Sequence, residues 1–220
     1  MAYRLAIFDL DGTLLNTIAD LGTACNAALA EKNLPQHDIE SYKAMVGHGM
    51  RNLVRNAMPE GLKDDEVLLD SLLESFFGHY LAHIDDFTVP YSGIPELLRK
   101  LQEEGVMLAV ASNKFQPGTD ALIKGKFPEI KFTDILGNRP GAPLKPDPEV
   151  VNLILRHTGI PASDAVMAGD SGTDIKTAAA AGIDCIAVSW GFRPRADLAD
   201  ATKVVDTADE LLKAILQKTI

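Results

Sequence analysis

The sequence predicts a doubly wound, Rossmann-like α/β fold, in which helices cover both faces of a parallel β-sheet. Four short apolar runs along the 220 residues have the length and the flanking turn residues of buried strands. Helical patterns lie between these runs, and strands that alternate with helices of this size are typical of βαβ crossovers. About seventy residues after the first strand lack any strand pattern, far more than an ordinary connection of ~2 to 6 residues. We therefore also expect an inserted helical domain.

The predicted strands cover residues 5–8, 106–111, 165–168 and 185–188. Each run is continuously apolar, like a strand buried on both faces of a sheet, and is too short for a helix. Pro95 and Gly105 predict a helix over 94–104, because proline is favoured at the start of a helix and glycine after its end. Further helices are predicted from Asp147 to His157, over 173–181, and after Thr207, whose spacing to Glu210 is that of a capping box.

The insertion carries apolar residues at helical spacing. One stripe begins at Ile18 and Leu21, and a longer stripe runs from Leu69 to Ile84. We expect an α/β core over residues 1–15 and 86–220 and a helical domain, called the cap below, over residues 16–85. The alternative, in which these are extra helices packed on an edge of the sheet, stays open at this point.

Composition and charge exclude several classes of protein. The chain has 21 basic and 31 acidic residues, a net charge of −10, and no basic run, so nucleic acid is not an expected partner. No apolar run approaches the ~20 residues of a membrane span, and Asp9 interrupts the first run too early for a secretory signal. We expect a cytoplasmic protein with reduced thiols at Cys25 and Cys185, which lie too far apart for the paired spacing of a zinc site.

Polar residues follow three of the predicted strands. The first strand leads to Asp9, Asp11, Gly12 and Thr13, the second to Ser112 and Asn113, and the third to Asp170 and Asp174. Because the carboxyl ends of parallel strands face one side of the sheet, where ligands bind, we expect these side chains to converge.

Convergent carboxylates predict a cation between them. They repel one another unless a positive charge intervenes, and hard oxygen ligands favour Mg²⁺ or Ca²⁺. Mg²⁺ is the better candidate, since it combines few protein ligands with substrate phosphate. Lys145, held beside Pro146, could neutralise a phosphoryl oxygen or hold an aspartate ionised. Taken singly, these residues also fit an Asp-Gly turn, a carboxylate in the first turn of a helix, and a solvated lysine. Their joint occurrence in this order favours a site.

Other motifs lack the context that they need. Gly169-Asp170-Ser171-Gly172 is similar to the surroundings of a serine-protease nucleophile, but neither a β-barrel nor a partnered histidine is indicated. His79 and His83 are four residues apart on a predicted helix without the glutamate of a zincin motif. Neither glycine-rich nucleotide-binding pattern occurs.

Four motifs resemble those of the haloacid dehalogenase superfamily of phosphohydrolases, and they run through the whole predicted core. FDLDGT at 8–13 is similar to motif I, SN at 112–113 to motif II, KPDP at 145–148 to motif III, and GDSGTD at 169–174 to motif IV. The helical insertion resembles the C1 cap of the phosphoglycolate phosphatase branch, as do residues 46–49 and 189–192.

The resemblance implies a two-step phosphoryl transfer. Asp9 would attack phosphorus and form an aspartyl phosphate, while Asp11 would act as general acid and then general base. Mg²⁺ would be bound by Asp9, Asp170 and the backbone carbonyl of Asp11. Ser112 and Lys145 would hold the phosphoryl oxygens, with Gly12, Thr13 and Asn113 beside them, and Asp174 would position a metal-bound water or Lys145.

The implied substrate is a small phosphorylated metabolite, with 2-phosphoglycolate the leading candidate. A β-phosphoglucomutase-like phosphotransferase and a pyrophosphatase or nucleotidase are alternatives. A non-catalytic phosphate-binding regulator is a further one, although it would be expected to have lost Asp9 or Asp11, and both are present. The oligomeric state is not predicted.

Specificity is expected to come from the cap, because the core groups recognise only phosphate and metal. The segment Gly47-His48-Gly49-Met50-Arg51 is the candidate, since its glycines let backbone N–H groups approach a ligand and it opens a predicted helix over 50–58. Arg51 would pair with a substrate carboxylate if it points inward. The alternative is a solvated arginine on the helix surface.

Overall fold

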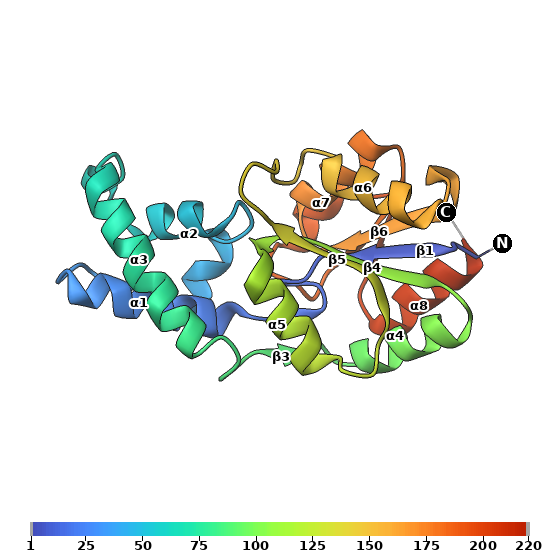
Figure 1. The fold of residues 1–220 in the computed structure, drawn as a ribbon, viewed down its shortest axis with the longest axis horizontal. Helices are drawn as coiled ribbons and strands as arrows, with labels where there is room; N and C mark the ends of the chain where they lie inside the picture. The colour runs from blue at the N-terminus through green and yellow to red at the C-terminus, as the bar shows by residue number, and fades with distance from the viewer. Residues whose placement is uncertain (1, 219–220) are drawn as a thin grey trace.

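The computed structural model describes residues 2–218, and the predicted parallel α/β fold is confirmed (Figure 1). Six strands form one sheet in the order β5-β4-β1-β6-β7-β8, and every pairing in it is parallel. The strands are β1 (Leu5–Phe8), β4 (Met107–Phe115), β5 (Phe132–Asn138), β6 (Ala165–Gly169), β7 (Asp184–Val188) and β8 (Lys203–Val205).

The sequence predicted the four central strands and missed the two at the edges. β1, β4, β6 and β7 have neighbours on both sides and are almost wholly buried, so they are continuously apolar. β5 and β8 each have one neighbour, are partly exposed and include polar residues, which removes the apolar signal. β4 also continues past its apolar part through Ser112 and Asn113, so these residues lie within the strand.

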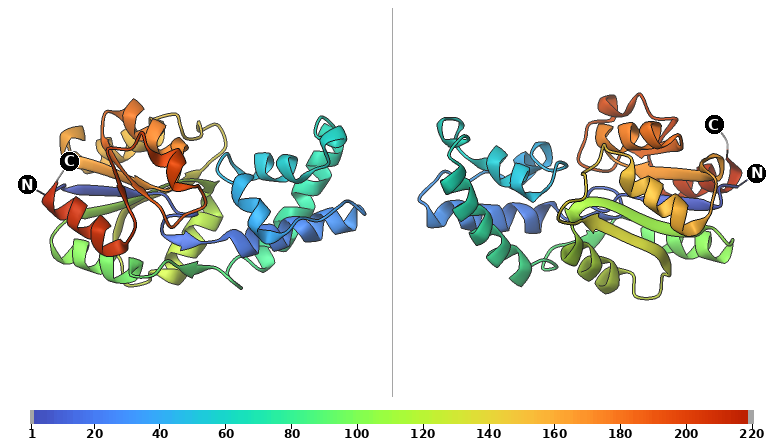
Figure 2. Two further views of the ribbon diagram at one scale, coloured as in Figure 1. Left: turned by 180° about the vertical axis from the view of Figure 1, so that it is seen from behind. Right: turned by 45° about the horizontal axis from the view of Figure 1, so that its top comes forward.

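Helices cover both faces of the sheet (Figures 1 and 2). Side chains alternate along each strand: Ala6 and Phe8 pack toward α4, α5 and α8, whereas Leu5 and Ile7 pack toward α6 and α7. These helices are α4 (Ile94–Glu103), α5 (Gln116–Lys126), α6 (Glu149–Thr158), α7 (Gly172–Ala181) and α8 (Ala208–Gln217), with short 3₁₀ helices η3 (Ala162–Asp164) and η4 (Arg195–Leu198). All the predicted core helices are present, and α5 was not predicted.

At the start of α8, one of the two hydrogen bonds of the predicted capping box is present, and the other goes to the residue before the expected one. The Thr207 hydroxyl accepts a hydrogen bond from the Glu210 N–H at 3.2 Å, as the spacing predicts. The Glu210 carboxylate instead accepts from the N–H of Asp206 at 2.8 Å. Both bonds satisfy N–H groups near the helix start, so the helix begins where the sequence indicates.

The cap residues form helices with an apolar cluster of their own. They are α1 (Ile18–Glu31), η1 (Ile39–Ala44), α2 (Met50–Ala57), η2 (Glu60–Leu62) and α3 (Glu66–Ala82). Leu21, Leu53 and Phe76 lie in this cluster, which shares no buried member with the two clusters on the sheet faces. The helices lie beyond one end of the strands and not along an edge strand (Figures 1 and 2). The exact domain boundaries stay a prediction.

Two short strands carry the chain out of the core and back. β2 (Leu15–Asn16) pairs antiparallel with β3 (Val89–Pro90). Beside them, the buried carboxylate of Asp20 in the first turn of α1 accepts hydrogen bonds from the N–H groups of Phe87 and Thr88, at 3.0 and 2.8 Å, and from the Thr88 hydroxyl at 2.6 Å. Asp20 therefore ties the outgoing helix to the returning chain.

No helix in residues 2–218 combines the length and the hydropathy of a membrane span. The cytoplasmic location stays a prediction. Cys25 and Cys185 are both buried free thiols.

We predict that Asp20→Ala lowers the free energy of unfolding by about 2 to 4 kcal/mol, because the buried N–H and hydroxyl of Thr88 and the N–H of Phe87 lose a charged acceptor. Urea denaturation followed by circular dichroism measures the change. Asp64→Ala, which removes an exposed carboxylate from the same domain, should change it by less than about 0.5 kcal/mol. Equal stability of the two variants would contradict the role given to Asp20.

Candidate active site

Asp9 stands directly after β1, and the backbone holds it at the end of the sheet. Its N–H donates to the carbonyl of Ala168 at 2.9 Å, and its Oδ1 accepts from the N–H of Leu10 at 2.7 Å. The chain then turns back, with the Gly12 N–H donating to the Leu15 carbonyl at 2.9 Å. Gly12 has φ +86°, and a Cβ there would overlap with the carboxylate of Asp170. This turn therefore requires glycine.

Lys145 joins two of the predicted carboxylates. Its Nζ lies 3.0 Å from Asp9 Oδ1 and 2.7 Å from Asp174 Oδ1, and its side chain is 2% exposed. Asn113 fixes the backbone of Lys145 from both sides: its Oδ1 accepts the Lys145 N–H at 2.8 Å, and its Nδ2 donates to the Lys145 carbonyl at 3.0 Å. Asn113 therefore positions the lysine, although it was predicted to bind phosphate or substrate.

Asp170 and Asp174 are held by different donors. Asp170 Oδ2 accepts from the N–H of Phe192 at 2.7 Å. Asp174 Oδ2 accepts from the N–H and the hydroxyl of Ser171, at 3.1 and 2.6 Å, in the capping box of α7. Because both oxygens of Asp174 are engaged, this buried carboxylate orients Lys145, in agreement with one of the two roles expected of it.

Burial and mutual repulsion shift the pKa values in this cluster. Burial raises the pKa of Asp9 well above its usual range; Lys145 opposes this shift, and Asp174 and Asp170 add to it. Burial, and then Asp174, raise the pKa of Asp170 to about 7. Burial alone would lower the pKa of Lys145, but Asp174 and Asp9 outweigh it and the pKa is raised. The site therefore holds more carboxyl groups than its single lysine can keep ionised.

This donor set fits a hard divalent cation. Carboxylate oxygens of Asp9, Asp170 and Asp174 lie within 4.8 Å of one another. Within the described chain, Asp9 Oδ2 and Asp170 Oδ1 carry no hydrogen bond, so they are the oxygens free to bind a metal ion. Asp9 and Asp170 lie together as the sequence predicts, but the third carboxylate of the cluster is Asp174 and not the side chain of Asp11. Such a group of carboxylates favours the binding of a cation such as Mg²⁺.

Asp11 has its own cation, which the sequence analysis missed. Its Oδ1 accepts from the hydroxyl of Thr17 at 2.7 Å and from Nζ of Lys114 at 3.0 Å. Lys114 lies in β4 with a side chain that is 0% exposed, and its Nζ is 4.8 Å from the ring centroid of Tyr80 in α3. A lysine inside an otherwise buried strand, directly after Ser112-Asn113, is the signal that could have identified it.

A pocket lies between the core and the cap above these groups. The core lines it with Asp9, Asp11, Ser112, Asn113, Lys114, Lys145, Asp170, Ser171 and Thr173, the cap with Val46, Gly47, Gly49 and Met50, and the loop after β7 with Phe192 and Arg193. Of the predicted core residues, Gly12, Thr13 and Asp174 lie outside this lining, and the Thr13 hydroxyl is buried without a hydrogen-bond partner. Phe192 and Arg193 were not predicted as site residues, and Met50 was predicted only as part of the cap segment 47–51.

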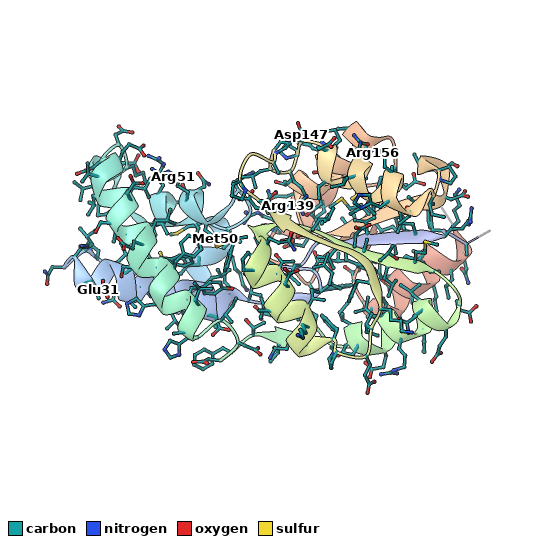
Figure 3. All side chains as sticks on the ribbon, in the orientation of Figure 1. Glu31, Met50, Arg51, Arg139, Asp147 and Arg156 are labelled. Carbon is teal, nitrogen blue, oxygen red and sulfur yellow. The ribbon has the colours of Figure 1, made fainter. Side chains whose placement is uncertain are left out.

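Arg51 does not point inward, so the condition for its pairing with a substrate carboxylate is not met in this structure. Its guanidinium pairs with Asp70 at 2.6 Å and Glu66 at 2.5 Å, and it does not line the pocket. Successive residues of an α-helix project about 100° apart, so the burial of Met50 toward the core turns Arg51 toward α3 (Figure 3). His48 is also exposed and outside the lining.

The histidines on α3 do not share a metal-binding geometry. His79 pairs with Glu31 and His83 with Asp86, each at 2.8 Å. These are separate surface pairs, which favours the interpretation of both as ordinary helix residues.

The comparisons with known proteins agree with this geometry. The family model of haloacid dehalogenase-like hydrolases matches residues 6–188. The chain belongs to this family. This haloacid dehalogenase-like hydrolase is 36% identical over 219 residues to a phosphoglycolate phosphatase of Pseudomonas savastanoi pv. phaseolicola, covering 96% of this chain and 78% of the relative. A phosphoglycolate phosphatase of Mesorhizobium japonicum is also 36% identical, over 89% of this chain and 86% of its own.

Solved structures share the whole architecture. A protein of Lactobacillus delbrueckii subsp. bulgaricus, provisionally assigned as a phosphoglycolate phosphatase, superposes with a TM-score of 0.92 at 35% identity, over 98% of this chain and 99% of that one. CbbY from Rhodobacter sphaeroides, solved with xylulose-1,5-bisphosphate, superposes with a TM-score of 0.76 at 23% identity, over 95% and 96% of the two chains. At that identity the second likeness shows the fold alone.

We predict that Lys114→Met lowers both stability and turnover, because it leaves the Asp11 carboxylate without its cation. The free energy of unfolding should fall by about 3 kcal/mol and kcat by at least ~10-fold. Urea denaturation and steady-state kinetics measure the two effects. Lys176→Met, at an exposed position in α7, is the control and should change neither. A Lys114→Met variant with the stability and kcat of the parent would overturn the pairing.

Proposed function

We propose that this hydrolase is a Mg²⁺-dependent phosphatase that hydrolyses a small phosphomonoester through an aspartyl phosphate. The observation that carries the proposal is the pairing of two neighbouring aspartates with different lysines in one pocket. Asp9 faces Lys145 at 3.0 Å, and Asp11 faces Lys114 at the same distance. Asp9 thus lies beside the ammonium group of Lys145, which can bind phosphate. Asp11 is held away from Asp9 by its own pairing with Lys114.

Asp9 is the nucleophile in this proposal. Its Oδ1, which faces Lys145, attacks phosphorus and leaves Oδ2 for the metal ion. The P–O bond to the leaving group breaks, and the leaving oxygen takes a proton from Asp11. In the second step Asp11 removes a proton from water, the water oxygen attacks phosphorus, and the Asp9–phosphorus bond breaks. Lys145 and the Ser112 hydroxyl line the pocket where negative charge collects on the phosphoryl oxygens.

Asp9 Oδ2, Asp170 Oδ1 and the backbone carbonyl of Asp11 are the groups that would hold Mg²⁺. When bound, the ion shields the negative charges of nucleophile and phosphate from each other. Asp174 stays outside the ligand set, since Lys145 and Ser171 occupy its oxygens. The excess of buried carboxylates over cations supports this assignment.

The leading candidate for the substrate is 2-phosphoglycolate. The curated relatives at 36% identity are named phosphoglycolate phosphatases, which favours a phosphatase over a β-phosphoglucomutase-like phosphotransferase. A non-catalytic regulator is disfavoured because Asp9 and Asp11 both line the pocket. A pyrophosphatase or nucleotidase would differ from a phosphoglycolate phosphatase in which substrate it hydrolyses. Phosphate release from 2-phosphoglycolate, a sugar phosphate, a nucleoside monophosphate and pyrophosphate tests these possibilities, and release from none of them would contradict the proposal.

We predict that Asp9→Asn lowers kcat by at least ~10³-fold, because a carboxamide of nearly the same size is a poor nucleophile. The fold should persist, since the substitution removes one member of a group of repelling buried charges. Phosphate release measures the loss, and thermal unfolding is the control for folding. Residual activity within tenfold of the parent would reject Asp9 as the nucleophile.

The metal assignment predicts a specific loss in Asp170→Ala. This variant should need a much higher Mg²⁺ concentration for half-maximal phosphate release, because it lacks a ligand oxygen. Ca²⁺ should inhibit the parent, since it takes more ligands at longer distances than Mg²⁺. Titrations of both ions against phosphate release measure these effects. Equal turnover with Ca²⁺ would count against the assigned ligand geometry.

A further inference from the structure

Arg193 is a cation of the pocket that the proposed chemistry does not use. Lys114 and Lys145 line the same pocket, and each is paired with aspartate. Over residues 2–218, no carboxylate lies within ion-pair distance of the Arg193 guanidinium. Its Nη1 and Nη2 donate instead to the backbone carbonyls of Lys43 and Val46 in the cap. Carbonyl oxygens satisfy N–H donors without cancelling the positive charge.

The loop that carries Arg193 is fixed against the metal-binding carboxylates. The N–H of the preceding residue, Phe192, donates to Asp170 Oδ2 at 2.7 Å. A Cβ at Gly191 would overlap with Asp170, so this loop packs closer to the aspartate than any side chain allows. The base of Arg193 is therefore held at a set distance from the groups that bind phosphate and metal, while its guanidinium extends to the cap.

The cap wall of the pocket contributes no charged side chain. It consists of Val46, Gly47, Gly49 and Met50. Gly47 has φ +120°, and a Cβ there would lie 3.2 Å from Arg193 Nη2, so glycine lets the guanidinium lie against the cap backbone. With phosphate held at Asp9, Lys145 and Ser112, the rest of the substrate must extend toward this wall. Arg193 is the cation that it meets there.

We propose that Arg193 recognises a carboxylate on the leaving group of the substrate and so selects short phosphorylated hydroxy acids over neutral phosphomonoesters. A guanidinium can hold a carboxylate by two parallel N–H···O bonds, in place of the two neutral carbonyls that it contacts here. The site that the sequence analysis sought at Arg51 is thus assigned to the opposite side of the pocket. This inference rests on the proposed phosphatase activity and adds the residue that selects its substrate.

The test compares 2-phosphoglycolate with its carboxamide, which has the same phosphate and nearly the same size but no negative charge at the other end. Arg193→Met should lower kcat/KM for the acid by about 100-fold and for the amide by less than about 3-fold. Arg193→Lys, which keeps the charge without the paired donors, should lose about 10-fold on the acid. Arg51→Met is the matched control, since this arginine lies in the cap outside the pocket, and it should change neither value by more than about twofold.

Each other outcome has a distinct meaning. Equal losses on acid and amide in Arg193→Met would show that Arg193 only holds the cap to the core, and would overturn the inference. Unchanged kinetics, or a parent that hydrolyses the amide as well as the acid, would also overturn it while leaving the phosphatase intact. A parent that releases phosphate from neither compound nor from an aryl phosphate would refute the proposed function and this inference with it.

Discussion

The site depends on the burial of three carboxylates of like charge around a single ammonium group. Lys145 contacts Asp9 and Asp174 at the carboxyl end of the sheet, and Asp170 completes the acidic cluster. Asp170 and Asp174 are buried, and Asp9 is largely so. Removing charges from water costs several kcal/mol for each ion unless they are paired and hydrogen bonded. Much of the local structure serves to meet this cost, including the Ser171 cap, the Phe192 N–H and the amide of Asn113. In the part of the chain that the structure describes, Asp9 Oδ2 and Asp170 Oδ1 receive no such hydrogen bond, and a divalent cation can neutralise their charge.

The separation of Asp9 from Asp11 follows from the second lysine. The two aspartates are two residues apart, yet their side chains contact different cations, on β4 for Asp11 and before α6 for Asp9. Asp11 is also held by Thr17, at the start of the outgoing chain, and Lys114 reaches the ring of Tyr80 in α3. The position of the acid–base group is therefore linked to the packing of the cap, whereas the direct contacts of the nucleophile described above all come from the core.

The features that could be predicted from the sequence are those determined by burial or by local backbone chemistry. The central strands and the core helices were found because continuous apolar runs and terminal signals report them directly, and the strand-end carboxylates were found because a parallel sheet places them together. β5 and β8 were missed because an edge strand lacks that apolar signal. The orientation of Arg51 stayed open because the sequence of α2 does not reveal which residue of the helix lines the pocket. Arg193 was missed because the resemblance at residues 189–192 ends just before it and does not reveal that this loop packs on Asp170.

The glycines beside the carboxylates explain how distant segments meet so closely. Gly12 follows β1, Gly169 ends β6 and Gly191 follows β7, and a Cβ at each would overlap with Asp170 or Asp174. The backbone thus approaches the acidic cluster from three segments, which brings N–H donors such as that of Phe192 within reach of the carboxylates and leaves no space for other side chains. Of the three, only Gly12 has a positive φ, so the requirement at Gly169 and Gly191 is for space and not for an unusual backbone conformation. The same close approach fixes the position of the loop that carries Arg193. The residue proposed to recognise the substrate carboxylate is therefore positioned by the same packing that forms the phosphate and metal site.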